Sequence, residues 1–130
     1  MGCTATAVTS VPAEPPTPLM CINQASKTHA AAIRAGFFGV RMLSVADEQK
    51  ARDLVGMNAV PDLFRDDGWT TSHSGAPMLS NRAAAFDCRV PTATALALHT
   101  VVFGEVVGAR QQAGSLLVYA LGRFIQVSAQ

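Results

Sequence analysis

Only two short segments of this sequence have the spacing of apolar residues that a helix needs, and this restricts the fold class most strongly. One covers residues 27–35 after a candidate N-cap at Ser26, and the other covers residues 45–54 after Ser44, with Asp47 completing a capping pattern. Two helices are too few to separate every pair of strands, which a doubly wound α/β sheet requires. The sequence therefore predicts a mainly β fold, an antiparallel barrel with two short helices.

Strands are predicted over most of the remaining chain. The run TATAVTSV at residues 4–11 is rich in β-branched side chains and predicts the first strand. The prolines that follow are expected to end it, because proline cannot donate to a strand ladder, and a second strand is expected from Leu19. Residues 56–80 show no periodicity and predict a long loop around Trp69. Later strands are predicted over residues 37–43, 83–90, 98–107 and 116–127, the last with a kink near Gly122.

The length and composition restrict the class of protein further. With 130 residues the chain is predicted to form one domain, residues 1–130. Its formal net charge of +1, without a basic run, excludes the electrostatic pattern of a nucleic-acid-binding protein. No run approaches the roughly 18 to 20 apolar residues that cross a membrane as a helix. The three cysteines lack metal-ligand spacing, so reduced thiols, a cytoplasmic location and no metal site are expected.

The motif CINQASKTH, residues 21–29, joins a predicted buried strand to the start of the first helix. Its hydroxyl and amide side chains stand where the helix begins, and the amides at a helix N-terminus favour anions because the helix dipole is positive there. The motif therefore predicts an anion-binding corner. On its own, Ser26 is more readily explained as a helix cap, and His29 as a solvated residue on the helix surface.

Five sequence blocks in a fixed order give the chain a strong resemblance to the flavin reductase family. They are TATAVTSV, PPTPLMCINQASKTHAAAIRAGFFGVRMLS, GAPMLSNRAAAFDCRV, HTVVFGEVVGAR and LLVYALGRF, and together they extend from Gly2 to about Phe124. The resemblance implies a homodimeric, FMN-binding split β-barrel that reduces FMN or FAD with NADH or NADPH. It also implies an oxygenase partner, because these proteins supply reduced flavin to two-component flavin monooxygenases.

The resemblance also assigns site residues. It places Cys21 and Asn23 near the flavin ring and ribityl chain, and Ser26 and Thr28 toward the phosphate. His99 matches the family histidine near the nicotinamide, where it would orient that cofactor for direct hydride transfer. The residues expected along the isoalloxazine edge are Thr4, Ala5, Thr6, Ala7, Thr9 and Ser10.

The sequence departs from the family pattern at several positions. Ala97 and Leu98 precede His99 where relatives have Gly-Asp, and Arg41 stands where they commonly have asparagine. The chain also begins where relatives have passed an N-terminal helix and a first barrel strand, so either the barrel is open or the sequence is a fragment or a mis-started reading frame. A missing strand would leave an open edge, which a dimer partner is expected to cover. A flavin-binding or dimer-forming split-barrel protein without reductase turnover is therefore the second hypothesis.

A third possibility is a Ser-His-Asp hydrolase. Ser74, His99 and Asp87 supply the three residue types. The GxSxG motif that exposes a nucleophilic serine on a strand-to-helix turn does not occur in the sequence, so this hypothesis is disfavoured.

Overall fold

The structure is a computed structural model and describes residues 2–5, 7–55, 64–65, 68–80 and 83–128. The strands are β1 (Val8–Ala13), β2 (Pro16–Asn23), β3 (Phe37–Met42), β4 (Trp69–Thr71), β5 (Pro77–Leu79), β6 (Ala84–Leu96), β7 (His99–Gln111), β8 (Leu116–Ala120) and β9 (Arg123–Val127). The helices are α1 (Lys27–Ala35) and α2 (Glu48–Val55), and a 3-10 turn, η1 (Val45–Asp47), precedes α2. The predicted mainly β fold with two short α-helices is confirmed in the described part of the chain.

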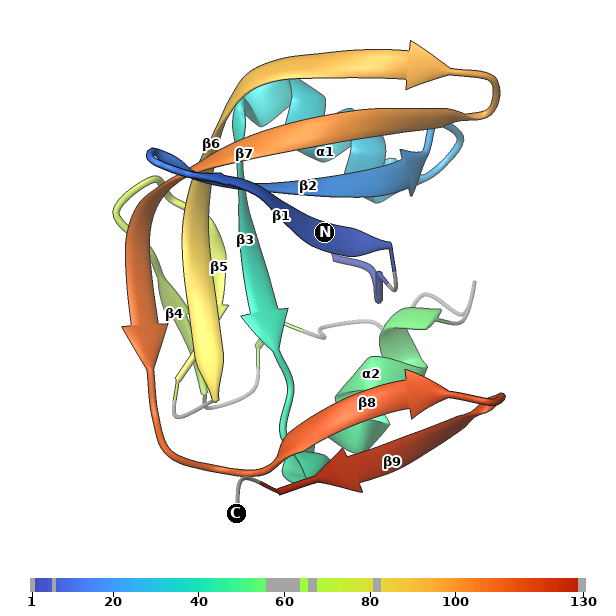
Figure 1. The fold of residues 1–130 in the computed structure, drawn as a ribbon, viewed down its shortest axis with the longest axis vertical. Helices are drawn as coiled ribbons and strands as arrows, with labels where there is room; N and C mark the ends of the chain where they lie inside the picture. Colours follow the sequence, from blue (N-terminus) through green and yellow to red (C-terminus); the bar gives the residue numbers. More distant parts are fainter. Residues whose placement is uncertain (1, 6, 56–63, 66–67, 81–82, 129–130) are drawn as a thin grey trace.

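Five strands form an antiparallel sheet that curves without closing on itself. Their order is β1-β2-β7-β6-β3, while β4-β5 and β8-β9 form separate hairpins. Figure 1 shows α1 near the β2, β6 and β7 end of the molecule and α2 beside the β8-β9 hairpin at the opposite end. The edge strands β1 and β3 do not pair with each other, so the barrel stays open along one seam.

The core of the sheet lies where β2 pairs with β7. Met20 and Ile22 are buried on one face of β2, and Val102 is fully buried opposite Met20 on β7. Phe38 of β3 and Val90 of β6 pack against this cluster. Strands that are distant in the sequence therefore meet around one small apolar core, which holds the walls of the candidate site together.

Helix α1 begins where the sequence predicts, and the second helical segment begins at the predicted Val45 as the 3-10 turn η1, with α2 following from Glu48. Ser26 caps α1, because its Oγ accepts a hydrogen bond from the backbone N of His29 at 3.0 Å. Gly36 ends α1 in the left-handed conformation with a φ of 76°, which glycine adopts without a Cβ penalty. Ser44 donates from its backbone N and its hydroxyl to the buried Asp47 carboxylate at 3.0 and 2.8 Å. The predicted capping pattern is thus confirmed, although the first turn after it is 3-10 rather than α-helical.

The prediction that the proline run ends the first strand is wrong. β1 continues to Ala13 and β2 begins at Pro16, and these two residues pair directly. Proline is tolerated here because this end of the hairpin lies outside the β7 ladder, which first engages β2 at Leu19. β1 also begins at Val8, four residues after the predicted start.

Three further boundaries differ from the predictions. β6 and β7 are longer than expected because they pair with each other as a long ribbon up to the Ala97-Leu98 turn, where β2 also pairs with β7 and the residues of β6 are exposed. The expected kink near Gly122 is the turn of the β8-β9 hairpin. The predicted loop over residues 56–80 contains the short β4-β5 hairpin, and part of it lies outside the described residues.

Candidate functional site

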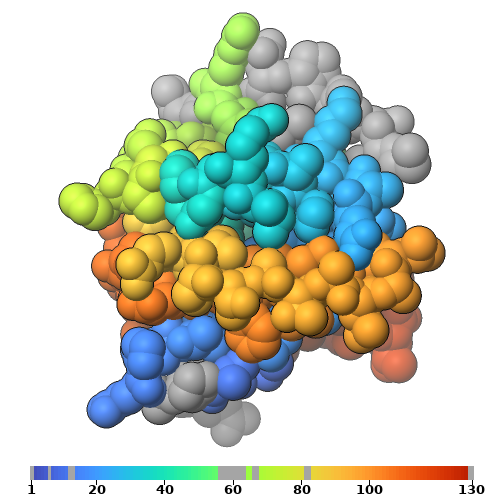
Figure 2. Space-filling view, turned by 90° about the horizontal axis from the view of Figure 1, so that it is seen from above, coloured from blue at the N-terminus to red at the C-terminus, as the bar shows by residue number. Residues whose placement is uncertain are grey.

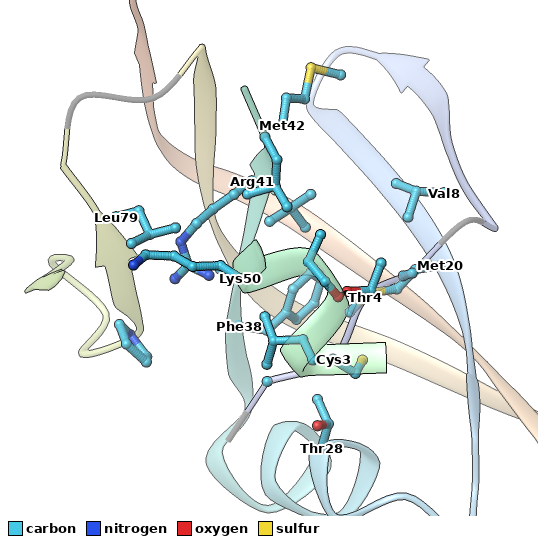
Figure 3. Close-up of a pocket in the computed structure, with 18 of the residues that line it drawn as sticks. Cys3, Thr4, Val8, Met20, Thr28, Phe38, Arg41, Met42, Lys50 and Leu79 are labelled. Carbon is cyan, nitrogen blue, oxygen red and sulfur yellow. Dashed lines mark hydrogen bonds between the residues drawn. The ribbon is translucent and has the colours of Figure 1, made fainter. Parts of the chain in front are cut away.

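A cavity of about 600 Å³ lies inside the open barrel (Figure 3). Its walls come from the N-terminal segment, β2, α1, β3, α2 and β8, and its lining is mainly apolar. The volume falls within the roughly 300–1,000 Å³ that is typical of small-molecule sites. Helix α1 presents one face of small side chains to it: Thr28, Ala31, Ala32 and Ala35. This small-residue stripe lets a ligand approach the helix closely.

A half-buried guanidinium, that of Arg41 on β3, belongs to the cavity wall. Its Cζ lies 4.7 Å from the centroid of the Trp69 ring on β4, which is a cation–π arrangement. Within the described residues, the buried Nε of Arg41 and the buried Nε1 of Trp69 have no hydrogen-bond acceptor. Burial lowers the pKa of Arg41 to about 10, because apolar surroundings disfavour the charged form, yet the group stays cationic at neutral pH. The cavity wall therefore includes a positive charge, whereas these two N–H groups are enclosed by protein atoms and do not face the open space.

Three of the residues predicted to bind the cofactor line this cavity, namely Thr4, Ala5 and Thr28. The Oγ1 of Thr4 donates to the Ala51 carbonyl at 2.8 Å, which fastens the N-terminal segment to α2. In Figure 3, Cys3 lies between Thr4 and Thr28, and burial raises the pKa of its thiol. These residues form a wall of small polar side chains beside the apolar core. The predicted contact Thr6 lies outside the described residues.

The other residues predicted along the flavin ring do not line the cavity. Ala7, Thr9 and Ser10 are exposed, on or just before the edge strand β1. The Ala7 carbonyl accepts a hydrogen bond from the Cys21 backbone N at 3.1 Å. Cys21 and Asn23 alternate with the buried residues of β2, so they face the opposite side of that strand. Their predicted roles remain predictions.

A second polar group gathers at the end of β2, where α1 begins. The Oδ1 of Asn23 accepts a hydrogen bond from the Ala25 backbone N at 2.8 Å, close to the cap made by Ser26. His99 pairs with Asn23 across β2 and β7, and its carbonyl accepts a hydrogen bond from Gln24 Nε2 at 2.8 Å. The structure thus brings Asn23, Ser26 and His99 together in one corner. The side chain of His99 is exposed and is not part of the cavity lining.

The expectation that His29 is a solvated surface residue is wrong. Its Nε2 lies 2.9 Å from the Oγ1 of the buried Thr100 on β7. Helix α1 turns this position toward the sheet, so the imidazole fastens the helix to β7 and gives a buried hydroxyl its partner.

The Ser26→Ala variant is expected to lower the free energy of unfolding by about 1 kcal/mol, the usual effect of removing an N-cap hydroxyl. The His29 N–H would lose its acceptor. Denaturant titration followed by circular dichroism measures the change, and Ser26→Asn, which can also cap a helix, should retain most of the stability. An unchanged transition in Ser26→Ala would mean that the cap contributes nothing.

Ser74 and Asp87 are in contact but do not form a triad with His99. Ser74 donates to the buried Asp87 carboxylate from its backbone N at 3.0 Å and from its hydroxyl. His99 pairs with Leu96 at the far end of the β6-β7 ribbon, nine residues along β6 from Asp87, which is roughly 30 Å of strand at about 3.3 Å per residue. The hydrolase hypothesis therefore has no geometric support. The contact instead holds the turn before β5 against β6.

Arg41 and Trp69 were not predicted as ligand-facing residues. The available signal was a cation within the otherwise apolar strand FFGVRM, because arginine is rarely buried without a partner. Trp69 was visible only as the one tryptophan in an aperiodic segment. Their contact depends on the β4-β5 hairpin lying near β3, which no local pattern indicates.

The described residues contain no helix that is long and apolar enough to cross a membrane. They also contain no group of three or more histidine, cysteine or acidic side chains placed to hold a metal ion. Cys3, Cys21 and Cys88 are free thiols, and burial raises the pKa of Cys88 to about 12.

Comparison with known proteins finds consistent relatives for almost the whole chain. The family described as flavin reductase like domain matches residues 1–128. The FMN reductase (NADH) RutF of Pseudomonas syringae is 34% identical over 122 residues, which cover 94% of this chain and 68% of that protein. The RutF of Bradyrhizobium diazoefficiens is 37% identical over 106 residues, which cover 82% of this chain and 59% of that protein. The chain thus spans about three fifths to two thirds of the length of these two relatives.

A solved structure has the same fold. BorF, the flavin reductase component of a bacterial two-component tryptophan halogenase, superimposes with a TM-score of 0.90 at 26% identity. The match covers 98% of this chain and 82% of that one. The split-barrel fold expected from the sequence is confirmed by this likeness together with the open five-stranded sheet.

Proposed function

The chain belongs to the flavin reductase family, and on that basis we propose that it uses NADH or NADPH to reduce FMN or FAD. The two relatives named above are FMN reductases that use NADH, which supports FMN and NADH as the first pair to test. Hydride transfer between a nicotinamide and a flavin makes the protein an oxidoreductase.

The observation that carries this proposal is the cavity and the chemistry of its wall. A volume of about 600 Å³ suits a ligand the size of a flavin. The small-residue stripe of α1 leaves space for a flat ring system. The mainly apolar lining suits a flat aromatic ring system. The residues present therefore fit this cofactor.

Within this proposal each predicted contact has a distinct task. Thr4, Ala5 and Thr28 bound the cavity and would position the ring by contact. Ser26 accepts a hydrogen bond from His29 but keeps its own hydroxyl proton, which it can donate to an anion. A bound flavin would supply the hydride acceptor. The outer contacts Thr6, Ala7, Thr9, Ser10, Cys21 and Asn23 remain predictions.

His99 is proposed to orient the nicotinamide rather than to act as an acid or base, because direct hydride transfer needs positioning. Its position also favours the second hypothesis, flavin binding without turnover. The imidazole is exposed and lies outside the residues that line the cavity. If a second subunit does not place its nicotinamide-binding residues beside this cavity, the chain would bind flavin without reducing it.

We further propose a homodimer, an oxygenase partner and a cytoplasmic location. Figure 2 shows β6 as a continuous band across one face of the molecule, and residues 91–99 are exposed. Leu96 and Leu98 expose 70% and 74% of their surface, and large exposed apolar side chains favour burial against another subunit.

BorF is the flavin reductase component of a two-component halogenase, which supports an oxygenase as the recipient of the reduced flavin. The free cysteines are consistent with a reducing compartment.

The test is NADH oxidation by the purified protein with and without FMN, followed by the loss of nicotinamide absorbance. Oxidation is expected only when FMN is present, and His99→Ala should lower kcat/KM by about 10- to 100-fold through misplacement of the nicotinamide. His73→Ala is the matched control, because His73 is also exposed but lies outside the cavity and the corner around Asn23. Flavin binding without oxidation would support the second hypothesis, and no flavin binding would contradict both.

A further inference from the structure

We infer that Gln24, in the loop between β2 and α1, is a positioning residue for His99 and offsets the strain of the turn that precedes it. Gln24 holds the backbone of β7 at His99 to the loop that leads into α1, so the imidazole keeps a fixed place relative to the start of that helix. The role of His99 toward a nicotinamide rests on the proposed function. The restraint on its backbone follows from the contacts alone.

The two hydrogen bonds that Gln24 makes to the start of β7 are the first argument. Its backbone N donates to the Leu98 carbonyl at 2.9 Å, and its side-chain Nε2 donates to the His99 carbonyl at 2.8 Å. Leu96 pairs with His99, so only two residues form the turn between β6 and β7. Figure 1 shows this turn near the end of β2 and the start of α1. One residue of the loop thus binds two successive carbonyls beside the turn.

A contact from α1 to the residue after His99 is the second argument. The Nε2 of His29, in the first turn of α1, lies 2.9 Å from the Oγ1 of the buried Thr100. His99 itself pairs with Asn23 across β2 and β7. Residues on both sides of His99 are therefore bound to the segment 23–29, which the family resemblance places beside the ribityl chain and phosphate of the flavin.

The conformation of the turn is the third argument, because it needs a restraint. Ala97 has a φ of 52°, in the left-handed region that a Cβ disfavours and that two-residue hairpin turns usually fill with glycine or asparagine. It is also one of the positions at which the sequence departs from the family pattern. Strained residues persist where the surrounding contacts enforce their conformation. Gln24 makes such contacts at the next two residues, Leu98 and His99.

The exposure of the turn makes these hydrogen bonds important. Leu96 and Leu98 expose 70% and 74% of their surface, and His99 is exposed as well. Side-chain packing therefore contributes little to the position of His99, which depends on hydrogen bonds. The bond from Gln24 Nε2 is made by a side chain, so a substitution can remove it without breaking the strand ladder.

The first test measures the restraint directly and needs no flavin. Hydrogen–deuterium exchange of a peptide covering residues 95–101 is compared in the wild type and in Gln24→Met, whose side chain has a similar length and no N–H. Exchange should be about 3- to 10-fold faster in the variant, the usual effect of one uncharged hydrogen bond. Gln49→Met is the matched control, because the exposed Gln49 donates to Asp53 at 2.8 Å on α2. It should leave this peptide unchanged, and unchanged exchange in Gln24→Met would overturn the inference.

The second test separates positioning of a nicotinamide from a general loss of structure. Gln24→Met should lower kcat/KM for NADH about 3- to 10-fold and leave the dissociation constant of FMN unchanged. In a His99→Ala background the same substitution should have no further effect, because Gln24 acts through His99. Multiplicative losses in the double variant, or an equal loss of FMN affinity, would overturn the inference. A wild type that does not oxidise NADH would refute the proposed function, and the exchange test would still decide the restraint.

Ala97→Gly tests whether strain is the reason that the turn needs Gln24. Glycine adopts the left-handed conformation without a Cβ penalty, so adding Ala97→Gly to Gln24→Met should restore most of the slow exchange and of kcat/KM. Ala95→Gly is the matched control, since Ala95 is also an exposed alanine of β6, and it should restore neither. Failure of Ala97→Gly to restore them, or equal recovery with Ala95→Gly, would overturn the inference that Gln24 offsets the strained turn.

Discussion

The Ala31→Phe variant is expected to bind FMN at least 100-fold more weakly than the wild type. Ala31 belongs to the small-residue stripe of α1 that lines the cavity. A benzyl group at this position would occupy the space that the proposed ligand needs, and it would find an apolar environment inside the cavity. We therefore expect a large loss of affinity without a large loss of stability. Equilibrium dialysis measures the affinity, and thermal unfolding measures the stability.

The neighbouring residue provides a matched control for this variant. Ala30 lies on the same helix but is exposed and is not part of the cavity lining. Ala30→Phe therefore makes the same change in helix propensity while leaving the cavity open, and it should bind FMN like the wild type. Equal affinities in both variants would show that the flavin binds elsewhere and would remove the observation on which the proposed function rests.

The Gly104→Ala variant is expected to lower the free energy of unfolding by about 2 to 3 kcal/mol, as overpacking of a tight core does. Gly104 is buried on β7, where a Cβ would overlap the Phe38 ring and lie 3.0 Å from the Cβ of Cys88. Cys88 is fully buried on β6, so the backbone cannot shift easily to relieve the contact. Denaturant titration measures the loss.

Gly108 on the same strand is the control for Gly104. A Cβ there would be 3.6 Å from the Cβ of Asp87, which is an ordinary van der Waals distance. Gly108→Ala should therefore change the free energy of unfolding by less than about 1 kcal/mol. Equal effects of both substitutions would mean that the clash with Phe38 is not the cause. Because Phe38 also lines the cavity, a repacked ring in Gly104→Ala should weaken ligand binding as well.

The position of Arg41 connects stability with function in this fold. Within the described residues no acidic side chain pairs with the half-buried guanidinium of Arg41, and proteins retain groups that reduce stability mainly where function needs them. The open cavity also reduces stability, because side chains that filled it would strengthen the core. The site therefore combines features that a purely structural role does not explain.

Local features of the fold were predictable from the sequence. Ser26, Gly36 and the Ser44-Asp47 pair mark helix ends through interactions within a few residues, so the bounds of α1 and the start of the second helical segment agree with the structure. The mainly β fold follows from the small number of helical segments. Membership of the flavin reductase family was recognisable from the order of its sequence blocks and is confirmed by the family match over residues 1–128.

Strand ends were predicted less well because they depend on neighbours. Proline weakens a strand mainly where both edges of that strand are paired. At the prolines of the first hairpin, β1 and β2 pair with each other, and β7 does not yet pair with β2. The β4-β5 hairpin and the far half of the β6-β7 ribbon contain residues with little periodicity. They are strands because another strand pairs with them, which a single segment cannot indicate.

Some features of the candidate site were likewise predictable from the sequence, and others were not. By itself the sequence determined which residue types stand at helix ends and strand faces, because capping and alternation act over a few residues along the chain. Only the tertiary structure decided that Thr4, Ala5 and Thr28 share a cavity while His99 lies outside it. It also decided that Arg41 meets Trp69, 28 positions later in the sequence. Such contacts arise from the pairing and packing of distant segments, whose energies no local pattern carries.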